Sequence, residues 1–179
     1  MDFFRIGEKL VSKQKIENMV EKILRLRMEG YSQQEVSQRL KVDRTFISRL
    51  ESLGEVRKGS RVAVVGFPIL NTEEVEAVLD EAGVDYRLIW TEAQRQQFIR
   101  DKDGPQLLAD FLQKVTEVRD YDVVVVLGSQ YRIRVSEAML DREVVGMVIG
   151  ESPITEDVYV DPQELRQLLQ NLVRVKRKP

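Results

Sequence analysis

The sequence predicts an α/β protein in which a small all-helical domain precedes a doubly wound, mostly parallel sheet. Through about residue 58, apolar residues recur at the spacing of amphipathic helices. From Arg61 onward, continuous apolar runs alternate with amphipathic stretches, which is typical of parallel strands joined by helices. The 179 residues, 42% of them apolar, suffice for one ordinary core and a small second domain. We therefore expect one domain over residues 1–58 and a second over residues 59–179.

Composition excludes several classes of chemistry. The chain has no cysteine and no histidine, so it lacks thiol and imidazole nucleophiles, disulfides and nearly all zinc sites, and we expect no metal and no cofactor. No apolar run approaches the roughly 20 residues of a membrane span, and the first ten residues lack the apolar core of a signal peptide. We expect a cytoplasmic protein with no membrane partner.

The net charge of -2 is divided unevenly along the chain. Residues 1–60 carry 13 Lys and Arg against 9 Asp and Glu, whereas the remaining residues carry 15 against 21. A basic N-terminal third suits a nucleic-acid partner, although an ordinary solvated surface can show the same asymmetry. The basic run from Arg174 to Lys178 either complements the end of the last helix or contacts phosphate.

The first helix is predicted from Ser12, a residue type suited to the N-cap, to the neighbourhood of Gly30. Its apolar stripe comprises Ile16, Met19, Val20, Ile23 and Leu24. Ahead of this helix, Phe3 and Phe4 are open to two interpretations: anchors exchanged with another molecule, or local packing.

Two shorter helices follow. Ser32, with Glu35 three residues on, forms the capping-box pattern and predicts a helix over residues 33–40. Asp43 is expected to cap a third helix over residues 44–53. The positions expected to face the core are Val36, Leu40, Val42, Ile47 and Leu50.

The stretch SQQEVSQRLKVDRTFISRLESLG, residues 32–54, closely resembles the helix-turn-helix of the phage repressor and Cro family of transcriptional regulators. In that family a Gln opens the first helix, a Glu follows two residues later, and Ile, Leu and Glu close the second helix. The matching residues are Gln33, Glu35, Ile47, Leu50 and Glu51. The chain departs from the pattern at Lys41, where the tight turn normally has Gly, and at Ser37, where the family has Ala. The resemblance covers about residues 12–58.

The resemblance implies that the second helix of the motif lies in the major groove of double-stranded DNA. Carried over by position, Arg44, Thr45 and Arg49 fall on base-reading positions, and Gln33 falls on a phosphate contact. Helix geometry adds Ser48 to the same side, and neighbouring cations are expected to bind phosphates. The expected DNA-binding residues are Gln33, Arg39, Lys41, Arg44, Thr45, Ser48 and Arg49. The alternative is a solvated polar face of a small helical hairpin.

The second domain is predicted as alternating strands and helices. The apolar runs RVAVVGF, DYRLIW, DVVVVLG and VVGMVIG predict four strands, and DVYV at residues 157–160 a short fifth. Helices are predicted after the cap pair Asn71 and Glu74, after Pro105, and after the N-cap Asp161. In the helix that Pro105 opens, the expected core-facing residues are Leu107, Leu108, Phe111, Leu112 and Val115. We expect a flavodoxin-like or Rossmann-like sheet with helices on both faces.

Ligands of such sheets bind beyond the carboxyl ends of the strands, where the strand order reverses. If the first and third strands are neighbours, the loops at residues 66–71 and 128–134 meet there. The candidate ligand-binding residues are Phe67, Asn71, Ser129, Gln130 and Arg132, which together suit an anion. The alternative is ordinary loop chemistry, because glycine commonly follows a strand and the two arginines of the second loop suit a solvated face.

Together these features predict a sequence-specific, DNA-binding transcriptional regulator rather than an enzyme, with the helix over residues 44–53 in the major groove. Because one small reader makes few contacts, we expect a homodimer held by the α/β domain, which also binds a small-molecule effector. One alternative is an adaptor whose α/β domain docks a protein partner. Another is a small nucleotide-dependent enzyme that uses carboxylates such as Glu151 and Asp157.

Overall fold

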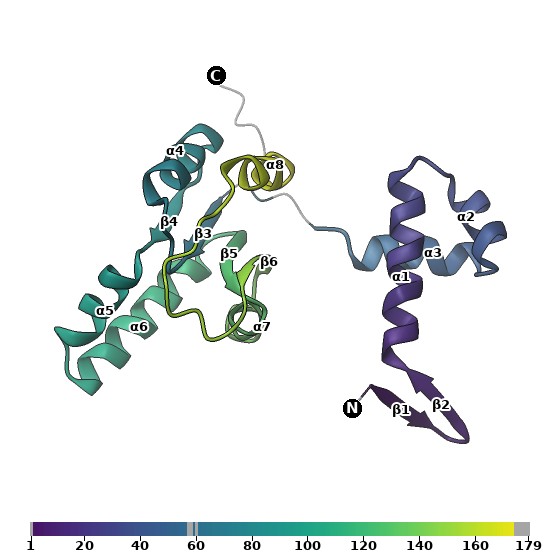
Figure 1. Cartoon of the computed structure of the whole chain (residues 1–179), viewed down its shortest axis with the longest axis horizontal. Coiled ribbons are helices and arrows are strands. Elements are labelled where there is room, and N and C mark those ends of the chain that lie inside the picture. The colour runs from purple at the N-terminus through teal and green to yellow at the C-terminus, as the bar shows by residue number, and fades with distance from the viewer. Residues whose placement is uncertain (1, 57–58, 60, 174–179) are drawn as a thin grey trace. The chain divides into compact units, whose positions relative to one another are not determined.

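The computed structural model describes residues 2–56, 59 and 61–173 (Figure 1). They form two compact units, Met1–Glu55 and Val56–Pro179, called here the first and second units. Eight helices and a four-stranded parallel sheet occur in the described residues, which confirms the predicted α/β class. The basic run at residues 174–178 lies outside the described residues.

The first unit comprises a two-stranded hairpin and three helices. Strands β1 (Phe3–Ile6) and β2 (Lys9–Ser12) lead into α1 (Lys13–Met28), followed by α2 (Gln33–Leu40) and α3 (Arg44–Leu53). The Ser12 side chain accepts a hydrogen bond from the backbone N–H of Lys15, so the predicted N-cap of the first helix is confirmed.

The prediction of an all-helical N-terminal domain is wrong, because β1 and β2 pair as an antiparallel hairpin. Its two-residue turn places Gly7 at a φ of 60°, a conformation that glycine adopts without steric cost. Four residues per strand are too few for the alternation of apolar and polar residues to stand out in the sequence. Phe3 and Phe4 are each 53% exposed, so neither belongs to the buried core of the first unit.

The core of the first unit contains one fully buried residue from each helix, namely Ile23, Val36 and Ile47. The predicted inward positions Leu40, Val42 and Leu50 pack against these three residues. In α1 the predicted stripe is wrong at two positions: Ile16 is 49% exposed and Leu24 is 41% exposed. Leu24 points away from the packed side of α1, whereas Ile16 lies two turns before Ile23 on nearly the same side and is not covered.

The second unit is built on a parallel sheet with the strand order β4-β3-β5-β6. Its strands are β3 (Val62–Gly66), β4 (Tyr86–Ile89), β5 (Val123–Ser129) and β6 (Glu143–Gly150). The chain runs outward from β3 to β4 and then returns past β3 to β5, so the strand order reverses between β3 and β5. All seven residues of β5 are buried, because it pairs on both sides and is covered on both faces.

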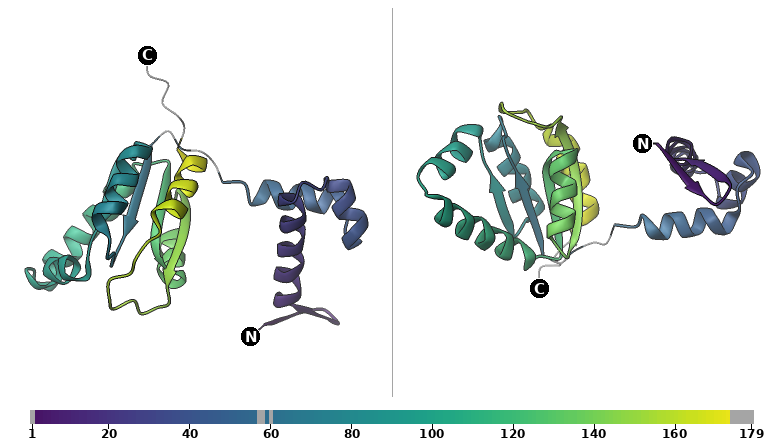
Figure 2. Two further views of the ribbon diagram at one scale, coloured as in Figure 1. Left: turned by 45° about the horizontal axis from the view of Figure 1, so that its top comes forward. Right: turned by 90° about the horizontal axis from the view of Figure 1, so that it is seen from below.

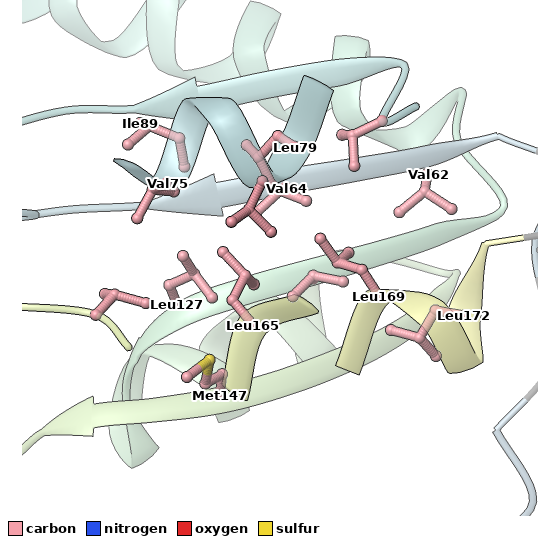
Figure 3. Packing of buried hydrophobic residues seen from close by; sticks show 14 of the residues in the cluster. Val62, Val64, Val75, Leu79, Ile89, Leu127, Met147, Leu165, Leu169 and Leu172 are labelled. Atoms are coloured by element: carbon pink, nitrogen blue, oxygen red, sulfur yellow. The ribbon is translucent and has the colours of Figure 1, made fainter. Parts of the chain in front are cut away.

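Helices cover both faces of this sheet (Figure 2). On one face lie α4 (Thr72–Ala82) and α8 (Pro162–Leu172), whose Leu79, Leu165 and Leu169 are fully buried against β3 and β5 (Figure 3). On the other face lie α6 (Gly104–Arg119) and α7 (Gln130–Met139). The alternation of Val62 and Ala63 toward opposite clusters follows from the two-residue period of a strand.

Several elements of the second unit differ from the prediction. Helix α7 begins in a segment predicted as a loop, and α5 (Glu92–Arg100) lies where no element was predicted, because the apolar residues of both are too sparse to mark a stripe. The DVYV segment is not a strand and contributes one isolated bridge, Val158 to Ile69. The predicted core face of α6 is wrong at Leu108, Phe111 and Leu112, which are 60%, 46% and 52% exposed.

Candidate functional site

The strongest candidate site is the outer surface of α2, α3 and the turn between them. Both helices begin with side-chain caps. Ser32 Oγ accepts from the N–H of Glu35 at 3.2 Å, while the Glu35 carboxylate accepts from the N–H of Ser32 at 2.8 Å. Asp43 Oδ1 accepts from the N–H of Thr45 at 2.6 Å. The predicted capping box and the predicted cap of α3 are therefore confirmed.

The same backbone hydrogen bonds lower the pKa values of both capping carboxylates. The N–H of Ser32 lowers the pKa of Glu35, and the N–H of Thr45 lowers that of Asp43. The positive charge of Arg49 lowers the pKa of Asp43 further. Both caps are therefore ionised at neutral pH and stabilise the positive ends of their helices.

The turn between α2 and α3 is held in a left-handed conformation. Lys41 has φ 54° and ψ 41°, and its N–H donates to the carbonyl of Ser37. The hydroxyl of Ser37 donates to the carbonyl of Val42 at 2.7 Å. A side chain in this conformation costs about 1 to 2 kcal/mol, which the surrounding contacts offset. The turn geometry that the resemblance implies is thus present although its glycine is absent.

The N-terminal half of α3 presents polar side chains to solvent. Arg44, Thr45, Ser48 and Arg49 are all exposed, whereas Ile47 on the opposite side is fully buried. Within the part of the chain that the structure describes, neither arginine makes a hydrogen bond or an ion pair through its guanidinium group. The structure therefore brings together the four α3 residues of the predicted site, with both guanidinium groups open to solvent.

The other predicted DNA-binding residues differ in their surroundings. Arg39 is exposed, and its guanidinium carbon lies 3.8 Å from the centre of the Tyr31 ring. Lys41 is exposed at the turn. Gln33 is half-buried, and its Nε2 donates to Glu51 Oε2 at 2.8 Å. The Gln33 side chain on α2 is therefore hydrogen-bonded to Glu51 on α3.

A second candidate site lies at the carboxyl ends of β3 and β5, where the strand order reverses. The guanidinium of Arg132 donates to the carbonyl of Phe67 and lies 4.3 Å from the centre of the Phe67 ring. Ser129 is only 3% exposed, and its hydroxyl accepts from the N–H of Arg132 at 3.3 Å. Ser129, Gln130 and Arg132 belong to the end of β5 and the first turn of α7, so their assignment to a loop is wrong.

One predicted member of this second site lies elsewhere. The side-chain amide of Asn71 donates to the carbonyl of Val160 at 2.9 Å and accepts from its N–H at 2.9 Å. Asn71 occupies the predicted N-cap position of α4, but its side chain makes no cap hydrogen bond to the backbone. Its amide instead donates to the Glu74 carboxylate at 3.0 Å. Because its amide joins two backbone segments, Asn71 is a structural residue.

Sequence reasoning missed the groups beside Arg132, because α5 was not predicted. Glu92 accepts from Arg95 at 2.8 and 2.6 Å and from Gln96 at 2.7 Å. These hydrogen bonds, the one from Arg95 being the largest cause, lower the pKa of Glu92 to about 2. Burial lowers the pKa of Arg132, and the charge of Arg95 lowers it further. The charge of Glu92 acts in the opposite direction and raises the pKa of Arg132, but in the described residues no carboxylate lies within ion-pair distance of the Arg132 guanidinium.

The carboxylates proposed for an enzyme do not gather. Glu151 is exposed, and Asp157 accepts a hydrogen bond from the N–H of Glu92 at 2.6 Å. The described residues contain no group of three or more Asp or Glu side chains placed to hold a metal ion. In the same residues, no helix has both the length and the apolar character needed to cross a bilayer.

Comparisons with known proteins give no relative. No protein-family model, no curated protein and no solved structure matches the chain.

Proposed function

We propose that the protein is a sequence-specific, DNA-binding transcriptional regulator of the helix-turn-helix class, with α3 in the major groove. The observation that carries this proposal is the exposed set Arg44, Thr45, Ser48 and Arg49 on one side of a capped helix. Arginine is the commonest bidentate reader of guanine, and Thr can contact a thymine methyl group. The left-handed turn at Lys41 supports the resemblance to the phage repressor and Cro family.

Several further features support this function. Arg39 and Lys41 lie next to α3 in the sequence, are exposed, and suit contacts to phosphates. A single helix-turn-helix unit contacts few base pairs. Useful affinity therefore requires two copies of the protein, bound to DNA half-sites about one helical turn apart. We therefore propose that the protein binds DNA as a homodimer and without a catalytic step.

For the second unit we propose a flavodoxin-like sheet that binds an anionic small-molecule effector at the reversal of strand order. The supporting observation is Arg132, a half-buried guanidinium with Phe67 stacked on it and no carboxylate ion pair in the described part of the chain. An anion can take up the remaining donors of such a guanidinium. Titration of the protein with inorganic phosphate and with a nucleotide tests this proposal. The Arg132→Gln variant should lose anion binding, whereas the control variant Arg134→Gln should retain it.

The experiment that tests the DNA-binding proposal is selection of random duplex DNA by the full-length protein at two salt concentrations. Enrichment of a two-fold symmetric site that survives the higher salt supports a dimeric, specific reader. An Arg44→Ala, Arg49→Ala double variant should lose the enriched site. An Arg134→Ala variant, which removes an exposed arginine of the second unit, should retain it. Binding that is lost at higher salt for every duplex contradicts the proposal and favours an adaptor.

A further inference from the structure

The first unit exposes more apolar side chains than its three-helix core explains. Of the nineteen exposed large apolar side chains in the described residues, seven lie between Phe3 and Met28. They are Phe3, Phe4, Ile6, Leu10, Ile16, Leu24 and Met28. Exposed apolar groups concentrated in this way mark interaction surfaces.

The hairpin contributes four of the seven. Phe4 and Ile6 project from one face of the hairpin, and Phe3 and Leu10 from the other, as the pairing register requires. Both faces are open, since every residue of β1 is exposed (Figure 1). A two-stranded hairpin on its own is marginally stable in water and needs a further strand or a packed surface. The hairpin therefore needs a covering surface that its own unit does not supply.

Helix α1 contributes an apolar stripe that begins near the core side of the helix at Ile16 and turns away from it toward Met28. Ile16, Val20, Leu24 and Met28 recur every four residues. The residues of α1 that pack in the core are Met19, Ile23 and Leu26. At 3.6 residues per turn, the centres of the two sets are separated by about one third of the helix circumference, with Ile16 nearest to the core set. Met28 at the far end of the stripe is 87% exposed.

We infer that this surface, called here the hairpin-α1 surface, binds a second copy of the chain through antiparallel packing of the two α1 helices. With the stripe centred between Val20 and Leu24, Ile16 of one copy faces Met28 of the other. The hairpin that precedes α1 in one copy then covers the C-terminal end of α1 in the other. The uncovered hairpin and the most exposed residue of the stripe are thereby buried together.

The charges beside the stripe are partly complementary in this arrangement. Lys13 and Glu17 form an ion pair at 3.4 Å, and Arg25 and Glu21 form one at 2.5 Å, so the two cations flank the two anions along α1. Antiparallel packing brings Glu17 of one copy near Arg25 of the other, and Lys13 near Glu29. Each contact occurs twice because of the two-fold axis. The same register places the two Glu21 side chains near each other at the two-fold axis, where each is paired with Arg25 of its own chain.

The extent of the surface suits a dimer. A specific interface buries about 800 Å² on each partner, from roughly 20 residues. The ten residues of Phe3–Ser12 and the uncovered half of α1 supply about this number. Isologous packing uses one self-complementary surface twice, so no second partner surface is required.

This inference rests on the proposed function, which requires two DNA-binding units, and it places the dimer contact in the first unit instead of the α/β domain expected from the sequence. It is tested without DNA. Sedimentation equilibrium of the full-length protein at micromolar concentrations should give twice the chain mass of 20.8 kDa. Leu24→Glu should give the monomer. Phe111→Asp, which places a charge in the exposed apolar stripe of α6, is the matched control and should remain dimeric.

Charge reversal tests the antiparallel arrangement itself. Glu17→Arg alone and Arg25→Glu alone should each weaken the dimer about tenfold, because both symmetric contacts become repulsive. An equimolar mixture of the two variants should recover dimer formation, because both contacts are then attractive between unlike chains. Damage to α1 cannot explain the recovery, since each chain in the mixture carries its own substitution unchanged.

The outcomes separate the two proposals. A protein that is monomeric throughout, a mixture that fails to recover, or a dimer lost through Phe111→Asp but kept with Leu24→Glu overturns this inference. A dimer that behaves as expected but selects no DNA sequence leaves it standing and overturns the proposed function. A protein that selects a DNA sequence but dimerises through α6 supports the proposed function and overturns this inference.

Discussion

Arg27 on α1 donates from Nε to Oε1 of Glu51 on α3 at 2.5 Å. The second carboxylate oxygen of Glu51 accepts from Gln33 on α2, and Arg27 also donates to the carbonyl of Tyr31. One carboxylate thus joins three helices, and its hydrogen bond from Arg27 is the main reason that the pKa of Glu51 is lowered. The orientation of α3 depends on this group.

Glu51→Ala should lower the free energy of unfolding by about 1 to 2 kcal/mol, because two charge-assisted hydrogen bonds at a half-exposed site are lost. Because α3 carries the proposed base-contacting residues and its orientation depends on Glu51, DNA affinity should fall more for the selected site than for unrelated sequences. Urea unfolding and competition binding measure the two effects. Glu55→Ala, an exposed carboxylate near the end of α3, is the control and should change neither.

Lys41→Gly should raise stability and lower DNA affinity. Glycine relieves the left-handed strain, although it adds freedom to the unfolded chain, so the net gain should be about 1 kcal/mol. The loss of the cation should weaken binding to all duplexes and reduce its salt dependence. Lys41→Asn tolerates the same conformation without the charge and should behave similarly. A less stable glycine variant would contradict the strain argument.

Arg49→Ala should cost about 1 to 3 kcal/mol of DNA-binding free energy and relax the preference at one base position. Arg39→Ala should weaken binding to all sequences alike, because it removes a phosphate contact. Competition binding with single-base variants of the selected site measures both. Uniform losses for both variants would show that the base-reading face has been assigned wrongly.

Acid should remove a stabilising contribution of Glu92. Its pKa is lowered from 4.5 to about 2, so this contribution is complete above the unfolded value and disappears as the pH falls from about 4.5 toward 2. Carboxyl-resonance titration should give a midpoint near 2. Arg95→Met should raise the midpoint, whereas Arg100→Met, an exposed cation of the same helix, should leave it unchanged.

The sequence predicted those features whose signals are local and strong. The caps at Ser32 and Asp43, the four central strands and the helix after Asp161 each depend on residues close together in the chain. The hairpin was missed because each strand has only four residues. The wrong face of α6 has a different cause, since helical periodicity identifies an apolar stripe but does not say whether anything covers it.

The two candidate sites also differ in whether they depend on residues close together or far apart in the sequence. The polar side of α3 follows from helix geometry, so it could be found from spacing alone. The surroundings of Arg132 depend on α5 and on contacts between residues such as Phe67 and Arg132, 65 positions apart. Asn71 was misassigned for the same reason, because its partner Val160 lies 89 positions away. No local pattern encodes such pairings.

The strand order of the second unit has a consequence for the time course of folding. Val62 pairs with Val123, so the central strands cannot meet until the intervening segment has been synthesised and its ends brought together. The first unit has a hairpin between adjacent strands and helices joined by short turns, so its contacts are local. Folding rates fall as the sequence separation of contacts grows. During synthesis, the first unit should therefore reach its native state while most of the sheet is still to be made.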